Sequence, residues 1–238
     1  MKHYAIMEYM KVVNRLQDVY IKTEEAWKGV HKRRLDEGII SGWYLYKVHY
    51  AYEGARHNYV TINTYDDFSR LSNVYPRHMV AEADPEKGYD GFEDMTEDSR
   101  KKMFSELSKL IDSCGPIDKT LTNSKYLKVA FMTVDECHKD KYAAMENKVW
   151  KKAHQYLVDQ GIQDWWALYE LEFPHGTSVG YQYITVSAVS DFDKLQELDY
   201  WGAYKACYPD GDFDGDYAKT LALRQCERAE LWELIDVL

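Results

Sequence analysis

The chain has 238 residues, of which 45% are apolar and 15% aromatic, enough for one large packed domain or two smaller ones. The formal net charge is −10 and no basic stripe offsets it, which argues against a nucleic acid or an anionic membrane surface as a partner. The four cysteines show neither a CxxC spacing nor a Cys/His cluster, so the sequence predicts free thiols and no zinc site.

The N-terminal stretch MKHYAIMEYMKVV carries Glu8 among its apolar residues and lacks a cleavage site of the A-x-A kind, so it does not read as a secretory signal. No run of about 18 apolar residues occurs in the chain. These patterns predict a soluble protein. We expect it to be cytoplasmic if the given sequence is the primary product, and exported to the periplasm if it is a mature form that lacks its signal peptide.

The first part of the chain alternates between strand and helix patterns. Residues 4–13 predict a strand, and a helix follows with apolar and polar positions at spacings of three and four, from Tyr20 through Trp27 and His31. Gly38 then stands where a helix C-cap glycine is expected.

Two aromatic-rich strands are predicted next, over residues 42–52 and 57–65, joined by a turn around residues 53–54. A second helix is predicted from residue 66 after an aspartate cap, followed by an acidic loop, a further helical stretch and a last strand near 105–112. The predicted order is β-α-β-β-α-β, the ferredoxin-like arrangement.

The same pattern is then written a second time. WKGVHKRRLDEGIISGWYLY (27–46) recurs as WKKAHQYLVDQGIQDWWALY (150–169), with 9 of 20 positions identical where chance gives roughly one or two. The upstream segment 4–20 matches 126–142, and the match continues downstream with single-residue slips. The sequence therefore indicates a duplication, with units at 1–114 and 126–238 and a linker at 115–125.

A ferredoxin-like unit covers one face of its sheet with helices and leaves the other face bare. In both units the strands are apolar on both sides, so the bare face needs a partner. The predicted fold class is therefore α+β, with two tandem βαββαβ units packed sheet to sheet into an intramolecular α/β barrel.

The duplicated order, together with the pattern Y…E…W-K-x-x-H…G-x-x-x-x-W-x-L-Y…Y-V-T-V, resembles the dimeric α/β-barrel superfamily over essentially the whole chain. Within it, the chain looks like a group of uncharacterised bacterial proteins, many of them exported. The resemblance implies one of several uses: cofactor-independent monooxygenase, lactone isomerase, haem protein, or no activity. No subfamily's catalytic motif is present to choose among them.

His31 and His154 are the first candidates for chemistry, because each follows a tryptophan by one helical turn. In related folds the ligand pocket lies between this helix and the sheet, so each imidazole is a candidate proton carrier or haem ligand. The alternative is a buried histidine satisfied by a neighbour. Tyr46 and Tyr169 are candidates to hydrogen-bond these histidines and to orient a substrate.

An aromatic set repeated in both halves is the second candidate. It is predicted to line a pocket for a flat hydrophobic ligand, or else to fill the core between sheet and helices. Its members are Trp27, Trp43, Tyr59, Trp150, Trp166 and Tyr183.

The stretch PDGDFDGDY (209–217) matches the opening of a calcium loop, with Gly215 at the sixth place. Leu221 occupies the twelfth place, where a bidentate glutamate is expected, so a solvated acidic loop is the alternative. The candidate calcium ligands are Asp210, Asp212, Asp214 and Asp216.

Three functions remain open from the sequence. The first is a small-molecule enzyme, a cofactor-independent monooxygenase or isomerase acting on a hydrophobic or aromatic compound. The second is a haem-binding protein, and the third is a non-catalytic binding or scaffold module. A monomer or a homodimer is expected in each case, and a cavity touching His31 or His154 distinguishes the first two from the third.

Overall fold

The computed structural model describes residues 3–51, 54–83, 85–116, 124–176 and 178–238. Glu53, in the predicted turn at 53–54, and most of the predicted linker lie outside these residues. Eight strands form a closed barrel in the order β1 (Tyr4–Lys11), β3 (Tyr59–Tyr65), β2 (Gly42–His49), β8 (Arg224–Val237), β5 (Tyr126–Val134), β7 (Tyr183–Val189), β6 (Trp165–Phe173) and β4 (Lys101–Cys114). The fold class predicted from the sequence is confirmed. None of the helices in the described ranges is long and apolar enough to span a membrane.

The chain divides into two compact units. Unit 1 comprises residues 1–107 and 234–238, and unit 2 comprises residues 108–233. Both last strands of the βαββαβ repeats, β4 and β8, are longer than the sequence predicts, so each begins in one unit and continues into the other.

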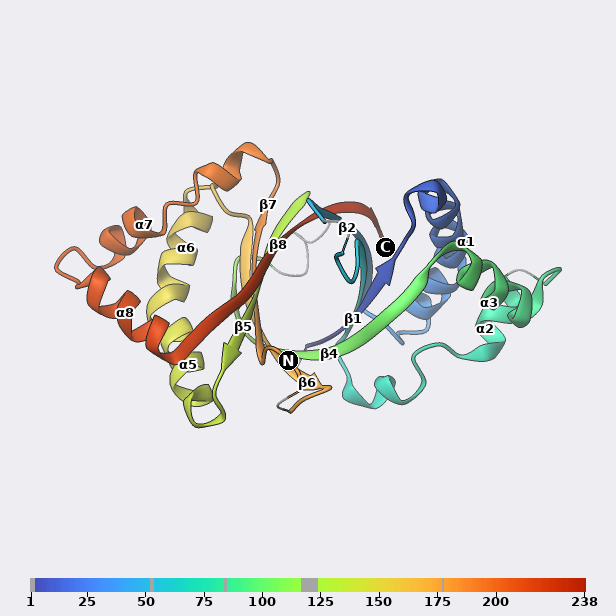
Figure 1. The fold of residues 1–238 in the computed structure, drawn as a ribbon, viewed down its shortest axis with the longest axis horizontal. Coiled ribbons are helices and arrows are strands. Elements are labelled where there is room, and N and C mark those ends of the chain that lie inside the picture. Colours follow the sequence, from blue (N-terminus) through green and yellow to red (C-terminus); the bar gives the residue numbers. More distant parts are fainter. Residues whose placement is uncertain (1–2, 52–53, 84, 117–123, 177) are drawn as a thin grey trace. The chain divides into compact units, whose positions relative to one another are not determined.

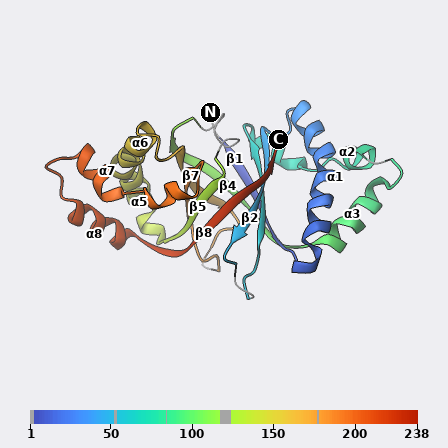
Figure 2. The ribbon, with the colours of Figure 1, turned by 90° about the horizontal axis from the view of Figure 1, so that it is seen from above.

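Unit 1 has the predicted order of elements. Its helices lie on one face of the strands (Figures 1 and 2). The elements are β1 (Tyr4–Lys11), α1 (Gln17–Asp36), β2 (Gly42–His49), β3 (Tyr59–Tyr65), α2 (Arg77–Ala83), α3 (Gly88–Ser99) and β4 (Lys101–Cys114).

Unit 2 repeats the arrangement, again with helices on one face of the sheet (Figure 1). Its elements are β5 (Tyr126–Val134), α5 (Lys139–Met145), a π-helical turn (Glu146–Trp150), α6 (Lys151–Asp159), β6 (Trp165–Phe173), β7 (Tyr183–Val189), α7 (Tyr200–Cys207), α8 (Phe213–Leu223) and β8 (Arg224–Val237).

The glycines predicted to end the first helix of each repeat do so. Gly38 and Gly161 follow α1 and α6 with φ of 63° and 68°, the left-handed conformation that a helix C-cap glycine adopts. The chain is thereby turned from the helix into the next strand at the same place in both repeats.

Strand register carries the equivalence into the sheets. In unit 1, β1 pairs antiparallel with β3 so that Glu8 lies opposite Thr61. In unit 2, β5 pairs with β7 in the same way, and Ala130 lies opposite Thr185. The two units therefore share a framework but differ in the side chains placed on it.

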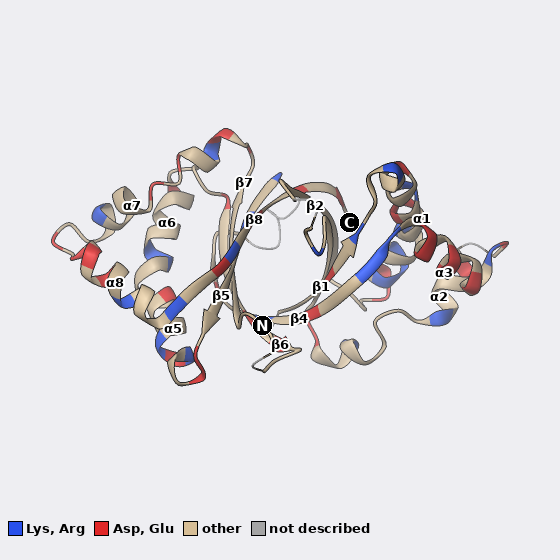
Figure 3. Ribbon diagram, in the orientation of Figure 1, with Lys and Arg blue, Asp and Glu red and all other residues tan. Residues whose placement is uncertain are grey.

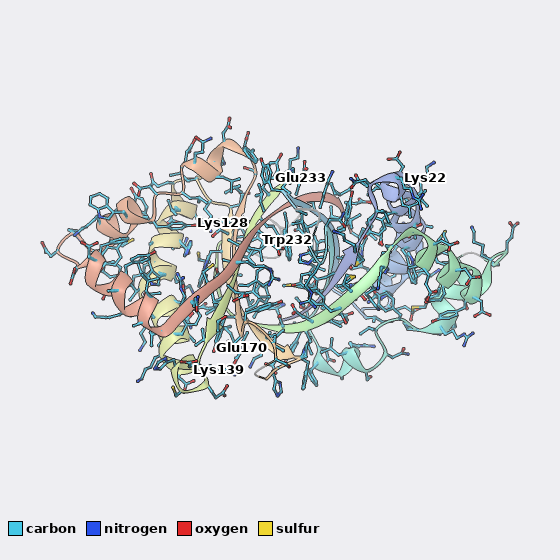
Figure 4. All side chains as sticks on the ribbon, viewed as in Figure 1. Lys22, Lys128, Lys139, Glu170, Trp232 and Glu233 are labelled. Atoms are coloured by element: carbon cyan, nitrogen blue, oxygen red, sulfur yellow. The ribbon has the colours of Figure 1, made fainter. Side chains whose placement is uncertain are left out.

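Charges of both signs are interspersed on the helices of each unit (Figure 3). Pairs also form near the strand ends: Lys139 lies 3.9 Å from Glu170 (Figure 4), and Lys109 lies 3.7 Å from Glu172. All four cysteines are free thiols, and Cys114 alone among them is buried.

Candidate functional site

Unit 1 has a cavity of about 660 Å³, partly open to solvent, between its helices and its sheet. The helix α1 contributes Glu24, Trp27 and His31, and the sheet contributes Glu8 and Trp43. Residues from the second helical region, and from strands β3 and β4, complete the wall: Tyr75, Val80, Tyr89, Glu93, Thr96, Glu97, Arg100, Thr61, Lys101 and Lys102. This cavity is lined largely by polar and charged side chains.

Unit 2 has a cavity at the equivalent place, but it measures only about 190 Å³. His154, Trp150 and Trp166 border it, as their counterparts do in unit 1. More of the remaining wall is aromatic or apolar than in unit 1, with Ala130, Met132, Tyr200, Phe213 and Tyr217. The other lining residues are Lys128, Glu146, Thr185, Ser187, Thr220 and Arg224. Both predicted histidines thus touch a cavity, the observation that favours a small-molecule site over a scaffold.

His31 is buried and its ring stacks on Trp43, with centroids 4.8 Å apart and planes 20° apart. Nη1 of Arg34 lies 2.8 Å from Nδ1 of His31. Because a guanidinium can only donate hydrogen bonds, Nδ1 must accept, and the proton of the neutral ring is on Nε2. Burial and the positive charge of Arg34 lower the pKa of His31 well below its usual value, so the ring is neutral.

His154 is held in the opposite way. Its Nδ1 lies 3.0 Å from Oε1 of Gln163, whose Nε2 donates a 2.9 Å hydrogen bond to the carbonyl oxygen of Trp165. That backbone bond fixes the amide, so Oε1 accepts and Nδ1 of His154 carries the proton. Nε2 therefore carries no proton and can accept a hydrogen bond. Burial lowers the pKa of His154 to about 4.

The sequence explains the reversal. In the repeat alignment Arg34 corresponds to Leu157, and Gln163 corresponds to Ile40. Each histidine thus has one polar partner on its Nδ1, and the partners come from different elements. The histidines recur in both halves, but their hydrogen-bonding roles do not.

Glu24 is the buried acid of the unit 1 cavity, with 3% of its surface exposed. Nε of Arg100 donates to its Oε1 at 3.3 Å. Burial raises the pKa of Glu24 to about 7, against the opposing effect of Arg100 and with a further increase from Glu8. A catalytic acid or base works best when its pKa lies near the working pH. The raised pKa therefore makes Glu24 a candidate for that role.

Glu8 adds a second carboxylate to unit 1. It accepts hydrogen bonds from the hydroxyl of Tyr75 at 2.7 Å and from Thr61 at 3.4 Å, and it lies 3.4 Å from Nζ of Lys102. Its counterpart in unit 2 is Ala130, so the second carboxylate belongs to unit 1 alone.

In unit 2, Glu146 corresponds to Glu24, and burial raises its pKa to about 7 as well. The spacing from this glutamate to the tryptophan is three residues in α1 and four in the second repeat. The π-helical turn Glu146–Trp150 absorbs the additional residue, so that both side chains still border the cavity. Such turns are insertions within a helix and are frequent at functional sites.

The predicted aromatic residues divide into two groups. The four tryptophans border the cavities, and Trp27 and Trp150 each donate a 2.8 Å hydrogen bond, to Thr96 and Thr220 respectively. Tyr59 and Tyr183 pack instead against Tyr20 and Tyr142, outside both cavity walls.

Tyr46 and Tyr169 lie away from the histidines. Side chains alternate across a strand, so Tyr46 points to the opposite face of its sheet from Trp43, and Tyr169 to the opposite face from Trp166. The hydrogen bonds predicted from these tyrosines to the histidines are replaced by those of Arg34 and Gln163.

Two of the four aspartates of the predicted calcium loop have partners within the protein. Asp212 caps α8 by accepting from the backbone N–H of Gly215 at 3.0 Å. Asp216 accepts from Tyr204 at 2.7 Å and from Lys219 at 2.9 Å. Asp210 and Asp214 are exposed, and no three metal-ligating side chains cluster in the described ranges, which include this whole loop.

Glu24 and Arg100 were not predicted as site residues, because the offsets to their counterparts in the second repeat differ from the offset of the repeated 20-residue segment. The quoted repeat aligns at 123, whereas Glu24 and Glu146 align at 122, and Arg100 and Arg224 align at 124. Aligning each segment at its own offset would have matched Glu24 with Glu146 and Arg100 with Arg224. No pattern in the sequence points to the contact between Glu8 and Tyr75.

Comparison with known proteins finds no matching family model and no matching curated protein. Solved structures do match. A Fusobacterium nucleatum protein provisionally described as a monooxygenase has a TM-score of 0.61 at 10% identity, covering 99% of this chain and 93% of its own.

Two further structures are similar over nearly their whole length. An anthrone oxidase-like protein has a TM-score of 0.57 at 12% identity, covering 100% of this chain and 92% of its own. A haem-binding protein from Thermus thermophilus has a TM-score of 0.55 at 12% identity, with coverages of 99% and 93%. At these identities the likeness shows a common fold.

Haem fits neither cavity as the residues stand. In unit 1 the nitrogen of His31 left beside the cavity carries a proton and offers no lone pair to iron, and buried carboxylates share the wall. In unit 2 His154 has the lone pair, but about 190 Å³ is below the roughly 300 Å³ at which pockets for drug-sized ligands begin, and a porphyrin is larger still.

Proposed function

We propose that unit 1 binds a small carbon acid and catalyses a proton transfer within it, as an isomerase does, with Glu24 as the group that carries the proton. The observation that carries this proposal is a buried carboxyl group with a pKa of about 7 on the wall of a cavity of about 660 Å³. At neutral pH such a group is present in both protonation states, so it can remove a proton and return it.

Arg100 is proposed to stabilise the negative charge that develops on the substrate. Removal of a proton next to a carbonyl group places charge on the carbonyl oxygen, and a fixed cation near that oxygen lowers the barrier. Arg100 is largely buried, borders the cavity and is held against Glu24 by a 3.3 Å hydrogen bond. The base and the cation are therefore adjacent, as the reaction requires.

His31 takes a different role from the proton carrier that the sequence predicts. Its lowered pKa keeps it neutral, so it does not take up a proton near pH 7. With Nδ1 engaged by Arg34, its Nε2–H is available to donate a hydrogen bond to a substrate oxygen. Trp27 and Trp43 supply flat apolar walls for the remainder of the molecule.

The experiment is hydrogen exchange into candidate substrates. Small lactones, enols and aryl ketones are incubated with the protein in deuterium oxide, and deuterium incorporation is followed by proton NMR. A substrate should exchange with wild type, with a rate that changes around pH 7, and should not exchange with Glu24→Gln. Glu146→Gln is the matched variant of unit 2 and should leave exchange unchanged.

Two outcomes contradict the proposal. One is exchange that survives in Glu24→Gln. The other is a compound that protects Trp27 and Trp43 from fluorescence quenching, and so occupies the cavity, while no compound in the panel exchanges.

A further inference from the structure

The unit 2 cavity differs from the unit 1 cavity in size, lining and histidine tautomer, and nothing in the proposed function uses it. We infer that it is a second binding site, specific for an uncharged single-ring aromatic molecule that carries a hydroxyl or N–H donor. The donor would bind Nε2 of His154.

The size of the cavity sets the size of the ligand. A buried apolar cavity of roughly 150 Å³ admits benzene. The unit 2 cavity is partly open to solvent, and at about 190 Å³ it accommodates one substituted aromatic ring, whereas a larger ring system would extend out of it.

The walls favour an aromatic ring. Trp166 stacks on His154 with centroids 4.9 Å apart and planes 14° apart, and Tyr200 meets the same imidazole edge-on at 5.2 Å. Trp150 and Phe213 form a second edge-to-face pair, with centroids 5.8 Å apart. Aromatic rings bind such surfaces through offset stacking and edge contacts.

The requirement for a donor comes from the histidine. His154 is 92% buried, since 8% of its surface is exposed, and Gln163 holds its Nδ1–H. Its Nε2 has no hydrogen-bond partner among the side chains and backbone groups that the structure describes. A ligand that fills the cavity without donating to this nitrogen would shield it from water and leave it unpaired, which is costly, so a ligand that donates to it is preferred to one of the same shape that does not.

The charges nearby disfavour a cationic donor. Lys128 (Figure 4) and Arg224 border the cavity and outnumber its one carboxyl group, Glu146, so a ligand ammonium would on balance be repelled. An uncharged O–H or N–H, as in a phenol or a pyrrole, meets no such repulsion. Unit 1 cannot offer the same site, because its histidine presents N–H rather than a lone pair.

Phenol and toluene are the matched probes, since they have the same shape and differ in the donor. Phenol should shift the Nε2 resonance of His154 in a two-bond proton–nitrogen NMR spectrum of the full chain, and toluene should not. In His154→Phe, phenol should bind about fivefold or more weakly, because its hydroxyl is buried without a partner, while toluene affinity stays within about twofold.

A second variant acts without altering the wall of the cavity. Gln163→Ile places at this position the residue found in the first repeat, and it frees His154 to move its proton to Nε2. Phenol binding should weaken in this variant too. Gln155→Leu, which removes an exposed hydrogen bond to Asp159 on α6, should change the affinity of neither probe.

Three results overturn the inference. The first is an Nε2 resonance in wild type that phenol does not move. The second is a parallel loss of phenol and toluene affinity in His154→Phe. The third is a phenol affinity in Gln163→Ile equal to that of wild type.

Discussion

Arg34 donates a 2.8 Å hydrogen bond to Nδ1 of His31, and this single contact sets the chemistry of the unit 1 cavity. It fixes the tautomer, and its charge helps to keep the ring neutral. The guanidinium is itself held by Asn63 at 2.9 Å and Tyr65 at 3.0 Å, and it stacks over Tyr75 at 4.2 Å. A buried charge with this many partners is a rigid support for the imidazole.

Arg34→Leu introduces the residue found at the same place in the second repeat. It leaves His31, Asn63 and Tyr65 without their donor, so we expect a loss of about 2 kcal/mol or more in the free energy of unfolding. The pKa of His31 should rise, because the nearest cation is gone, and NMR titration of the ring protons measures this. The control is Arg33→Leu, whose ion pair with Glu82 is solvent-exposed and whose loss should cost within about 0.5 kcal/mol. Equal losses in the free energy of unfolding for Arg34→Leu and Arg33→Leu would contradict the role of Arg34 as a rigid support for His31.

The stability of the protein should depend on pH through Glu24. Its pKa in the folded state, about 7, lies above the ordinary value of 4.5, so the folded chain binds more protons between these values. Stability should therefore fall as pH rises from about 4.5 to about 7 and stay constant above, with a total contribution of roughly 3 kcal/mol.

Glu24→Gln removes the part of that dependence that comes from Glu24, because the amide cannot ionise, while Glu146, whose pKa is also raised to about 7, keeps its own part. The variant should match wild type near pH 4 and exceed its stability at pH 8, as measured by urea unfolding at both values. Glu25→Gln, exposed on the same helix, should show no such divergence. A constant difference between Glu24→Gln and wild type at both pH values would show that Glu24 has an ordinary pKa.

Haem should not bind through either histidine. Titration of haem into the protein should give no Soret band of a histidine-ligated iron, because one imidazole offers a proton and the other borders a cavity that is too small. A stoichiometric Soret band that disappears in His154→Ala but persists in His31→Ala would show that unit 2 opens to admit the macrocycle.

Asp212 is expected to act as a helix cap. Asp212→Ala should destabilise the protein by about 1 kcal/mol in the presence of a calcium chelator, since the backbone N–H of Gly215 loses its acceptor. Asp210→Ala, exposed and outside α8, is the control and should change little. Calcium that raises the unfolding temperature of wild type, but of neither variant, would instead support the calcium loop that the sequence predicts.

The fold could be predicted from the sequence because each signal was repeated. A strand–helix–strand pattern seen once is ambiguous, but Trp27, His31 and Gly38 recur with the same spacing as Trp150, His154 and Gly161. The lengths of β4 and β8 were underestimated, since their exposed N-terminal halves carry many charged residues and lack an apolar alternation.

The site could be predicted only in part. The histidines and tryptophans share a helix face, which periodicity reveals. The partners of the histidines do not follow from periodicity, because Arg34 is one turn along α1 while Gln163 lies in the loop after α6. The placement of Glu8 against Tyr75 depends on a contact across 67 residues, which no local pattern records.

The π-helical turn at Glu146–Trp150 is also the place where the first helices of the two repeats differ in length. An extra residue in an α-helix normally rotates everything beyond it by about 100°, yet here Tyr142, Glu146, Trp150 and His154 are all still buried on one side of the helix. The amide oxygen of Asn147 is buried without a partner in the part of the chain that the structure describes. Excising Asn147 would return the spacing from Glu146 to Trp150 to the three residues of α1, so the two repeats differ in length here and still present a glutamate and a tryptophan to their cavities.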